Sequence, residues 1–441
     1  MPDAAAHDRS PARSPSPTAP FVTPPVHVVG AGPGGLATAA ALRARGVRAV
    51  VLEKSDGVAA SWRGHYDRLR LHTTRRLSSL PGLVIPRAYG RWVGRDDVVR
   101  YLEQYAEHHR LEIVTGAEVR RIDPATPHRK EPPTGQANTP TRHDSFAVDH
   151  SRSASPGHFA PATAHDNGHP HTHRWTLHIT GDRTLTSAPV IVATGFNHTP
   201  HLPDWPGRAT YTGELLHAAH YRNPRPYVGK DVLVVGTGNT GAEIAADLAH
   251  GGAARVWLAV RTPPHIVRRS TAGWPAQATG ILVRRLPPHT VDRAARVMRR
   301  LSIPDLAPYG LPAPETGLYS RALQGAIPVQ DVGLIDAVRG GLVRPVAAVE
   351  SFDGDEVRLA DGSVLRPEVV IAATGYRRGL DSLVGHLGVL DSRGRPRVHG
   401  PDTLPTAPGL RFTGYTNPIS GMFRELALDA RRIARAVAGV A

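Results

Sequence analysis

Two glycine-rich turns in this chain have the residue spacing that could bind phosphate groups. They are Gly30-Ala-Gly32-Pro-Gly-Gly35 and Gly236-Thr-Gly238-Asn239-Thr240-Gly241. In both, a β-branched run precedes the first glycine and an alanine-rich stretch follows the last one. This spacing lets the backbone turn tightly, approach a pyrophosphate and pack a helix against a strand. It therefore predicts two dinucleotide sites, each with the pyrophosphate at a helix N-terminus.

Each glycine turn is followed by a helical stretch and then a second strand-like run. The residue directly after this second run distinguishes the two sites. Glu53 follows the run 47–52, and a carboxylate at this place can accept hydrogen bonds from a ribose 2′-hydroxyl. Arg261 follows the run 256–260, and a guanidinium can hold a 2′-phosphate that a carboxylate would repel. The difference predicts FAD at the first site and NADPH at the second. If Arg261 is an ordinary surface arginine, this preference for a phosphorylated ribose is lost.

The elements that must position these residues are two βαβ units, which predict an α/β fold with two Rossmann-like dinucleotide-binding domains. The first unit has strands at 26–30 and 47–52 around a helix that Gly46 ends, and the second spans 231–260. The region 262–330 is expected to be less regular. Periodicity predicts helices at 95–110 and 423–439 and strand-like runs at 112–122, 175–179, 188–193, 342–350, 356–359 and 366–373.

We expect the first domain to be discontinuous in sequence. We expect a disordered tail at 1–24, the FAD-binding domain at 25–205 and 373–441, and the NADPH-binding domain at 206–372, inserted between its two parts. Residues 125–173 are polar, His- and Pro-rich, and predict a long insertion in a surface hairpin. We predict no metal site. His169, His171 and His173 could bind a metal ion weakly, but nothing near them supplies a fixed ligand geometry.

Composition narrows the possible function classes. The chain has no Cys, which excludes disulfides and a dithiol relay. It has neither an apolar run long enough for a membrane span nor an N-terminal signal core, so we expect a cytoplasmic protein. The formal charge of +15 comes mainly from arginines spread along the chain, so no nucleic-acid partner is expected. The Ala, Arg, Pro and Gly richness is typical of high-GC bacterial genomes.

From about residue 25 onwards, apart from the insertion, the chain resembles the class B flavin-dependent monooxygenases, especially the YUCCA-like and bacterial flavin-containing ones. Tyr211-x-Gly213-x3-His217-x3-Tyr221 is similar to the family signature, with Tyr for the leading Phe. Baeyer–Villiger enzymes usually end this signature in Trp, which argues against the typical form of that branch. The other matching segments are Ser61-Trp62, Tyr66–Thr73, Ala193–Phe196, Ala373–Tyr376 and Gly414–Gly421. The two Ala-Thr-Gly segments resemble the places where such chains cross between the nucleotide domains.

The resemblance also implies site residues. Those implied for FAD are Gly30, Gly32, Gly35, Glu53, Lys54, Trp62, Thr73 and Val119, and those for NADPH are Gly236, Gly238, Asn239, Thr240, Gly241 and Arg261. His72 and Asn417 are the implied catalytic candidates. His217 is implied to couple the domains. Animal-type members have Asn where this chain has His72, and YUCCA-like members have His. Both histidines could instead be ordinary hydrogen-bonded residues.

The activity implied by the resemblance is a monooxygenase reaction. NADPH reduces FAD, and the reduced flavin reacts with O2 to give a C4a-(hydro)peroxide that oxygenates a small organic substrate. The candidates are N- or S-oxygenation and the oxidative decarboxylation of an aryl pyruvate such as indole-3-pyruvate. Three alternatives remain open: Baeyer–Villiger-type ketone oxygenation, an NADPH reductase or oxidase that oxygenates no substrate, and, most distantly, a basic nucleic-acid-binding protein. The oligomeric state is open, a homodimer included.

Overall fold

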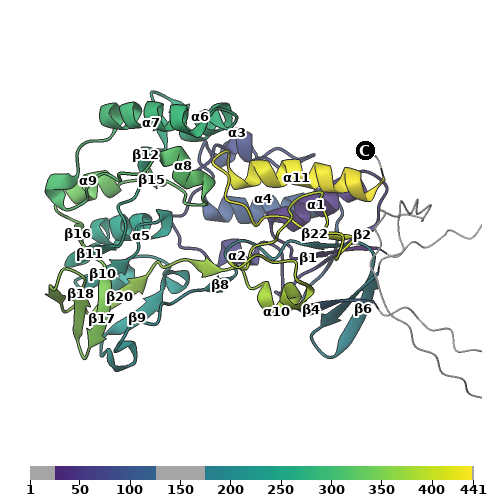
Figure 1. The fold of residues 1–441 in the computed structure, drawn as a ribbon, viewed down its shortest axis with the longest axis horizontal. Coiled ribbons are helices and arrows are strands. Elements are labelled where there is room, and N and C mark those ends of the chain that lie inside the picture. The colour runs from purple at the N-terminus through teal and green to yellow at the C-terminus, as the bar shows by residue number, and fades with distance from the viewer. Residues whose placement is uncertain (1–24, 126–173, 440–441) are drawn as a thin grey trace, which may run out of the picture.

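The structure is a computed structural model that describes residues 25–125 and 174–439. Its two largest sheets are parallel and mark two lobes (Figure 1). The predicted tail at 1–24 and nearly all of the predicted insertion at 125–173, including its three clustered histidines, lie outside the described residues.

The first lobe is built on a sheet with the strand order β22-β7-β1-β2-β3. Its short Val- and Ile-rich strands are mostly buried on both faces, as parallel strands between two layers must be. They are β1 (Val26–Val29), β2 (Ala49–Leu52), β3 (Glu112–Val114), β7 (Val190–Val192) and β22 (Leu410–Phe412). Residues 112–122 were expected to form one strand-like piece. They instead belong to two sheets, because the chain turns at Gly116, where φ is +65°.

Helices cover one face of this sheet and an antiparallel sheet covers the other. The helical layer contains α1 (Pro33–Arg43), α4 (Arg95–His108) and α11 (Met422–Val437), and α11 packs on α1 (Figure 1). The other layer contains β4 (Val119–Pro124), β5 (Trp175–Ile179), β6 (Arg183–Ser187) and α10 (Asp381–Val384). β4 and β5 pair antiparallel, so the predicted insertion connects two neighbouring strands.

The second lobe has a sheet with the order β16-β11-β10-β20-β9. Its strands are β9 (Glu214–His217), β10 (Asp231–Val235), β11 (Arg255–Val260), β16 (Arg344–Ala347) and β20 (Val369–Ala372). α5 (Asn239–His250) and α9 (Leu334–Arg339) pack on one face. The antiparallel strands β17 (Val349–Asp353), β18 (Glu356–Leu359) and β19 (Val364–Leu365) pack on the other.

The expectation of less regular structure over 262–330 was wrong. This region contains β12 (Ile266–Arg268), β13 (Ser270–Thr271), β14 (Trp274–Pro275), α6 (Ala276–Val283), α7 (Pro288–Ser302), α8 (Leu318–Leu323) and β15 (Val329–Asp331). The prediction gave weight to the Pro and Arg content of this region and did not use the helical spacing of the apolar residues in α7, which are Val291, Ala294, Val297, Met298 and Leu301.

The chain crosses between the lobes twice. It leaves the first sheet after β7 and enters the second at β9, then leaves the second after β20 and returns at β22. Both crossings follow an Ala-Thr-Gly segment, as predicted, and β8 (Thr199–Pro200) pairs with β21 (Tyr376–Arg377) between them. The guanidinium of Arg378 lies 4.6 Å from the ring centroid of Phe196 and adds a contact between the crossings. The domain bounds 25–205, 206–372 and 373–441 themselves stay a prediction.

Candidate cofactor sites and the contacts between the lobes

The two glycine turns have the same local geometry. A Cβ atom on Gly35 would lie 1.9 Å from the carbonyl oxygen of Gly30, and one on Gly241 would lie 2.0 Å from that of Gly236. At the middle glycines, Gly32 and Gly238, no atom lies within 4 Å of a built Cβ. The last glycine therefore lets the helix approach the strand, while the middle one leaves open space beside the helix N-terminus. This arrangement fits a pyrophosphate at both turns.

Glu53 is buried at the end of β2 beside the first turn, with 8% of its surface exposed. Its carboxylate accepts hydrogen bonds from the backbone N–H of Ala31, at 2.7 Å, and of Ser55, at 3.0 Å. Each carboxylate oxygen keeps a lone pair after these bonds, so Glu53 can hold the turn and still accept a ribose hydroxyl. The neighbouring Lys54 lies with Nζ 3.3 Å from Nε2 of His198, near the first crossing.

At the second turn, the side chain of Asn239 is already engaged. Its Nδ2 donates to the carbonyl oxygen of Pro328, and its Oδ1 accepts from the backbone N–H of Gln330. Asn239 thus anchors β15 to the start of α5, and only its backbone remains for a phosphate. Thr240 follows it in the first turn of α5. Arg261 is exposed directly after β11, and none of the described carboxylates pairs with it.

His72 faces a buried glutamate of the opposite lobe. Its Nε2 lies 2.9 Å from Oε1 of Glu243, which is on α5 and only 3% exposed. The other carboxylate oxygen accepts a 3.0 Å hydrogen bond from the Tyr66 hydroxyl. The Nδ1 atom of His72 is buried and has no partner among the described residues. An unpaired buried nitrogen in a segment expected to border the flavin fits a site that is completed by a bound group.

Sequence reasoning missed Glu243. A glutamate inside a helix ordinarily lies on the solvent side, but here it lies between alanines and isoleucine on the buried face of α5. That position in the apolar period is the signal that could have found it. Burial, together with the nearby Glu243, holds the pKa of Tyr66 well above its usual value, so the phenol stays a neutral donor.

The four fixed residues of the Tyr211–Tyr221 signature all have structural roles. The Tyr211 hydroxyl donates to the carbonyl oxygen of Pro367, and its ring leaves no room for a side chain at Gly213. The buried Tyr221 donates to Oδ2 of Asp247 at 2.7 Å, and Arg68 from the first lobe pairs with the same aspartate at 3.2 Å.

His217 connects the signature to the second crossing. Its Nδ1 accepts from the backbone N–H of Ala219 at 3.0 Å, so Nε2 must carry the proton of the neutral ring. That Nε2 donates to the carbonyl oxygen of Gly375, also at 3.0 Å, and the ring packs against Tyr376. Burial lowers the pKa of His217, which keeps this neutral form.

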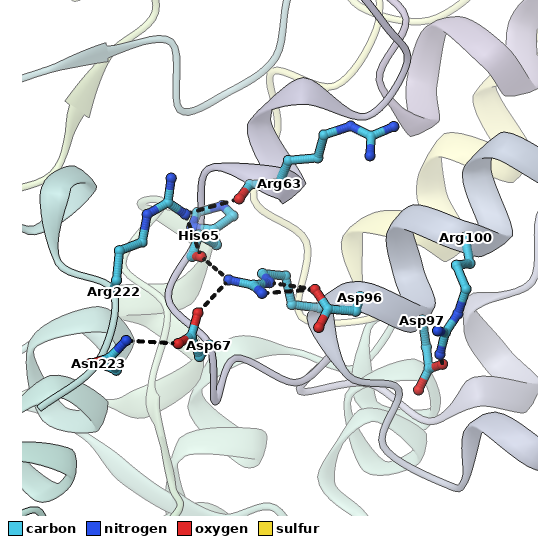
Figure 2. A network of polar contacts seen from close by, with 9 residues as sticks. Arg63, His65, Asp67, Asp96, Asp97, Arg100, Arg222 and Asn223 are labelled. Carbon is cyan, nitrogen blue, oxygen red and sulfur yellow. Dashed lines mark hydrogen bonds and ion pairs between the residues drawn. The ribbon is translucent and has the colours of Figure 1, made fainter. Parts of the chain in front are cut away.

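A polar network joins the lobes at the surface, directly after the signature. Figure 2 shows Arg222 donating to the backbone oxygens of Arg63 and His65, while Asn223 donates to Asp67 at 2.9 Å. Arg95 binds the other oxygen of Asp67 at 2.8 Å. The hydrogen bond from Asn223, helped by Arg95, holds the pKa of Asp67 below its usual value. The carboxylate is therefore charged at neutral pH.

The two predicted catalytic residues lie in different contacts. Asn417 donates to the carbonyl oxygen of Gly325 at the end of α8, and it does not hydrogen bond to His72 in the described part of the chain. Between these segments, the buried Gln277 of α6 accepts from the backbone N–H of Thr74 and donates to the carbonyl oxygen of Ser420. Gln277, which sequence reasoning also missed, therefore ties α6 to both flavin-bordering segments.

Three further predicted flavin contacts lie in the first lobe. Trp62, on the short helix α2 (Ala60–Arg63), packs edge-on against Phe423 of α11. Thr73 shares a 2.7 Å hydrogen bond with Ser78 of α3 (Arg75–Ser78). Val119 begins β4 and pairs with Ile179 of β5, so part of its backbone is used by the sheet.

Residues 25–125 and 174–439 contain neither a membrane-spanning helix nor a cluster of metal ligands. No helix there is long and apolar enough to cross a membrane. Nor do three or more His, Asp or Glu side chains gather there in a way that could hold a metal ion.

Comparison with known proteins gives two family matches. Residues 174–380 match the flavin-binding monooxygenase-like family, and residues 27–130 match the pyridine nucleotide-disulphide oxidoreductase family. The indole-3-pyruvate monooxygenase YUCCA1 of Oryza sativa subsp. japonica is 33% identical over 393 residues, which cover 88% of this chain and 86% of the relative.

Solved structures share the fold at lower identity. A flavin-containing monooxygenase from Stenotrophomonas maltophilia superposes with a TM-score of 0.63 at 21% identity, covering 94% of this chain and 98% of the other. OTEMO, solved in complex with FAD and NADP, gives a TM-score of 0.63 at 15% identity, covering 94% and 84%. The arrangement of two nucleotide-binding lobes is thus common to all three.

Proposed function

Because this chain belongs to the class B flavin-dependent monooxygenases, enzymes that use FAD, NADPH and O2, we propose that its substrate is an aryl pyruvate. The observation that carries this choice is the 33% identity to an indole-3-pyruvate monooxygenase over 88% of the chain. His72, which the YUCCA-like members share, supports it. The enzyme is an FAD- and NADPH-dependent monooxygenase, and the aryl pyruvate is the specific proposal.

The proposed reaction is an oxidative decarboxylation. The bond between the keto carbon and the carboxylate breaks, and the keto carbon gains one oxygen atom from O2. The products are an arylacetate, CO2, water and NADP+, so that NADPH and one proton supply the two hydrogens of the water. When bound, the flavin accepts hydride from NADPH and activates O2. No metal ion is needed for this balance.

The first glycine turn and Glu53 are proposed to hold FAD. The open space at Gly32 lets the pyrophosphate meet the N-terminus of α1, and Glu53 accepts the ribose hydroxyls. The remaining FAD contacts in this proposal come from Gly30, Gly35, Lys54, Trp62, Thr73 and Val119.

The second turn is proposed to hold NADPH at the N-terminus of α5. Arg261 is the group for the 2′-phosphate, because it is an exposed guanidinium at the place where the first site has Glu53. Gly236, Gly238 and Gly241 give the backbone close access, and Asn239 and Thr240 offer their backbone N–H groups.

The residues between the lobes are proposed to position the cofactors and exclude water, rather than to break bonds. Tyr66 and His72 meet Glu243 at one contact, and Gln277 links Thr74 to Ser420 at another. Water exclusion matters because an exposed oxygen adduct would be lost as H2O2. His72 is proposed to present its unpaired Nδ1 to the flavin or substrate, and Asn417 to hold the flavin-contacting loop against α8.

The test of the substrate class is a panel assay with the FAD-loaded enzyme. Phenylpyruvate, indole-3-pyruvate, an aryl sulfide, a tertiary amine and a cyclic ketone are compared for NADPH consumption, and each product is identified by mass. We expect arylacetates from the two pyruvates with little H2O2. Efficient conversion of only the sulfide or the amine would contradict the proposal in favour of S- or N-oxygenation.

We also propose a cytoplasmic enzyme of bacterial origin that forms a homodimer. NADPH is supplied in the cytoplasm, and the Ala, Arg, Pro and Gly richness supports the bacterial source. Light scattering coupled to size-exclusion chromatography tests the dimer, and a mass near the 47.2 kDa of one chain would contradict it.

A further inference from the structure

A cavity of about 500 Å³ lies between the two lobes, beside the contact of His72 with Glu243. This volume is within the usual range of small-molecule sites. The first lobe contributes residues 67–70, Trp92 and Gly94, and the second contributes Glu243, Arg269 and Asp331–Val332. The cavity therefore borders the Glu243 carboxylate, which faces His72. His72 belongs to the segment that the family resemblance implies to border the flavin.

Three arginines line this cavity, and they differ in what they bind. Arg68 pairs with Asp247, and Arg70 donates to the carbonyl oxygen of Trp92. Arg269 is half-buried, and none of the described carboxylates lies within ion-pair distance of it. Its guanidinium lies 5.1 Å from the ring centroid of Trp92. Arg269 is thus the lining cation whose charge is left without a paired carboxylate.

Three carboxylates also line the cavity, and each has polar contacts of its own. Glu243 meets Tyr66 and His72, and Asp67 binds Arg95 and Asn223. Asp331 accepts from backbone N–H groups at the start of α9. The lining thus has three acidic and three basic side chains, and Arg269 has no ion pair among the described residues. Burial lowers the pKa of Arg269, the nearby Glu243 and Asp331 raise it, and repulsion by Arg70 and Arg68 lowers it. A bound anion would offset the burial and the repulsion.

We propose that this cavity binds the carboxylate end of an aryl α-keto acid, with Arg269 as the group that holds the anion. A guanidinium can bind a carboxylate through two parallel hydrogen bonds, which fixes the orientation of the ligand as well as its charge. Leu69, Trp92 and Val332 also line the cavity and give it apolar surface against which the aryl ring can pack. This inference rests on the proposed function, because it names the residue that recognises the carboxylate of the proposed aryl pyruvate.

The test measures binding separately from turnover. Indole-3-propionate, which has the carboxylate but no keto group to react, and its neutral isostere indole-3-propionamide are titrated into the FAD-loaded enzyme by calorimetry. The variants are Arg269→Gln and Arg269→Lys. The matched control is Arg285→Gln, which removes an exposed arginine outside the cavity. Thermal unfolding of each variant checks the fold.

We expect Arg269→Gln to weaken indole-3-propionate binding by roughly 10- to 100-fold, as expected for losing hydrogen bonds to a charged group. Binding of the amide should be little changed. Arg269→Lys should fall between wild type and Gln, because it keeps the charge and loses the planar fork. If Arg269→Gln does not fold, the carboxylate binding measured with Arg269→Lys decides instead. Unchanged carboxylate binding in Arg269→Gln, or equal weakening of the acid and the amide, would overturn the proposal.

Failure of this site and failure of the proposed function can be told apart. If the enzyme converts no aryl pyruvate but Arg269→Gln still selectively weakens carboxylate binding, the substrate proposal fails and the anion site stands. If aryl pyruvates are converted and Arg269→Gln binds the carboxylate like wild type, the anion site is contradicted and the function stands.

Discussion

The Nε2 atom of His217 donates a hydrogen bond to the carbonyl oxygen of Gly375, and this single bond joins the end of β9 to the second crossing between the lobes. The other ring nitrogen, Nδ1, accepts a hydrogen bond from the backbone N–H of Ala219, so the ring is held at both nitrogens. We therefore propose that the signature histidine acts on the path of the chain between the two nucleotide sites rather than on a reacting atom.

Replacing His217 should uncouple NADPH oxidation from oxygenation without removing FAD. His217→Asn can keep the bond from Ala219 but cannot reach Gly375, whereas His217→Gln can place an amide N–H near that carbonyl. We expect more H2O2 per NADPH in the Asn variant and a smaller effect in the Gln variant. H2O2 yield and FAD content give the measurement, and equal coupling in Asn and wild type would show that the bond to Gly375 is dispensable.

Glu243 should matter for stability as well as for activity. Glu243→Ala removes the acceptor of the Tyr66 hydroxyl and the carboxylate that faces His72, and we expect a loss of about 2 to 3 kcal/mol in the free energy of unfolding. Glu243→Gln keeps one amide oxygen as an acceptor and should lose less. Urea unfolding measures both, with the exposed Glu107→Ala as the control. If Glu243→Ala and the control are equally stable, the contact adds nothing.

Arg261 should set the preference for NADPH over NADH. Removing its guanidinium in Arg261→Ala takes away charged hydrogen bonds to the 2′-phosphate, so the KM for NADPH should rise roughly 10- to 100-fold. The KM for NADH should change little, because NADH has no phosphate there. Steady-state kinetics with both cofactors is the measurement, and Arg339→Ala, on the exposed end of α9, is the control. A parallel rise for both cofactors would assign Arg261 a merely structural role.

Asp429 on α11 predicts a specific pH dependence of stability. Burial raises the pKa of its carboxyl from 3.8 to about 6 in the folded chain. The folded state thus favours the protonated form, so this contribution is complete below about pH 4 and lost as pH rises through about 6. We discount the full shift for partial solvation and expect a loss of about 2 kcal/mol.

The matched variant for this pH effect is Asp429→Asn, which cannot ionise but can still accept from Nδ1 of His399. Its stability relative to wild type should rise between about pH 4 and pH 7. Urea unfolding across this range gives the curve, with the exposed Asp402→Asn as the control. A constant difference between Asp429→Asn and wild type would show that Asp429 does not titrate in this window.

The local signals in the sequence predicted the two nucleotide-binding folds well, because glycine spacing and β-branched runs act within a few residues. The strands flanking both turns, the helices α1 and α5 and both Ala-Thr-Gly crossings lie where expected. The segment 262–330 did not follow its prediction, because its Pro and Arg content suggested irregular structure although α7 has apolar residues at helical spacing.

Contacts between the lobes were beyond the reach of sequence reasoning. The apolar period of α5 marks Glu243 as buried but does not name its partners, and the roles of Gln277 and Arg269 appear only when residues far apart in the chain meet. Asn239 is a similar case. Its place in the glycine turn predicts a cofactor contact, whereas its side chain binds β15.

Labelled oxygen tests the central claim most directly. The FAD-loaded enzyme is given NADPH, phenylpyruvate and ¹⁸O2, with excess catalase because free H2O2 also decarboxylates α-keto acids. The account predicts one phenylacetate per NADPH, with one labelled oxygen in its carboxylate, at a yield that catalase does not change. If catalase abolishes phenylacetate while NADPH is still consumed, the chain is an oxidase toward this substrate and the account is contradicted.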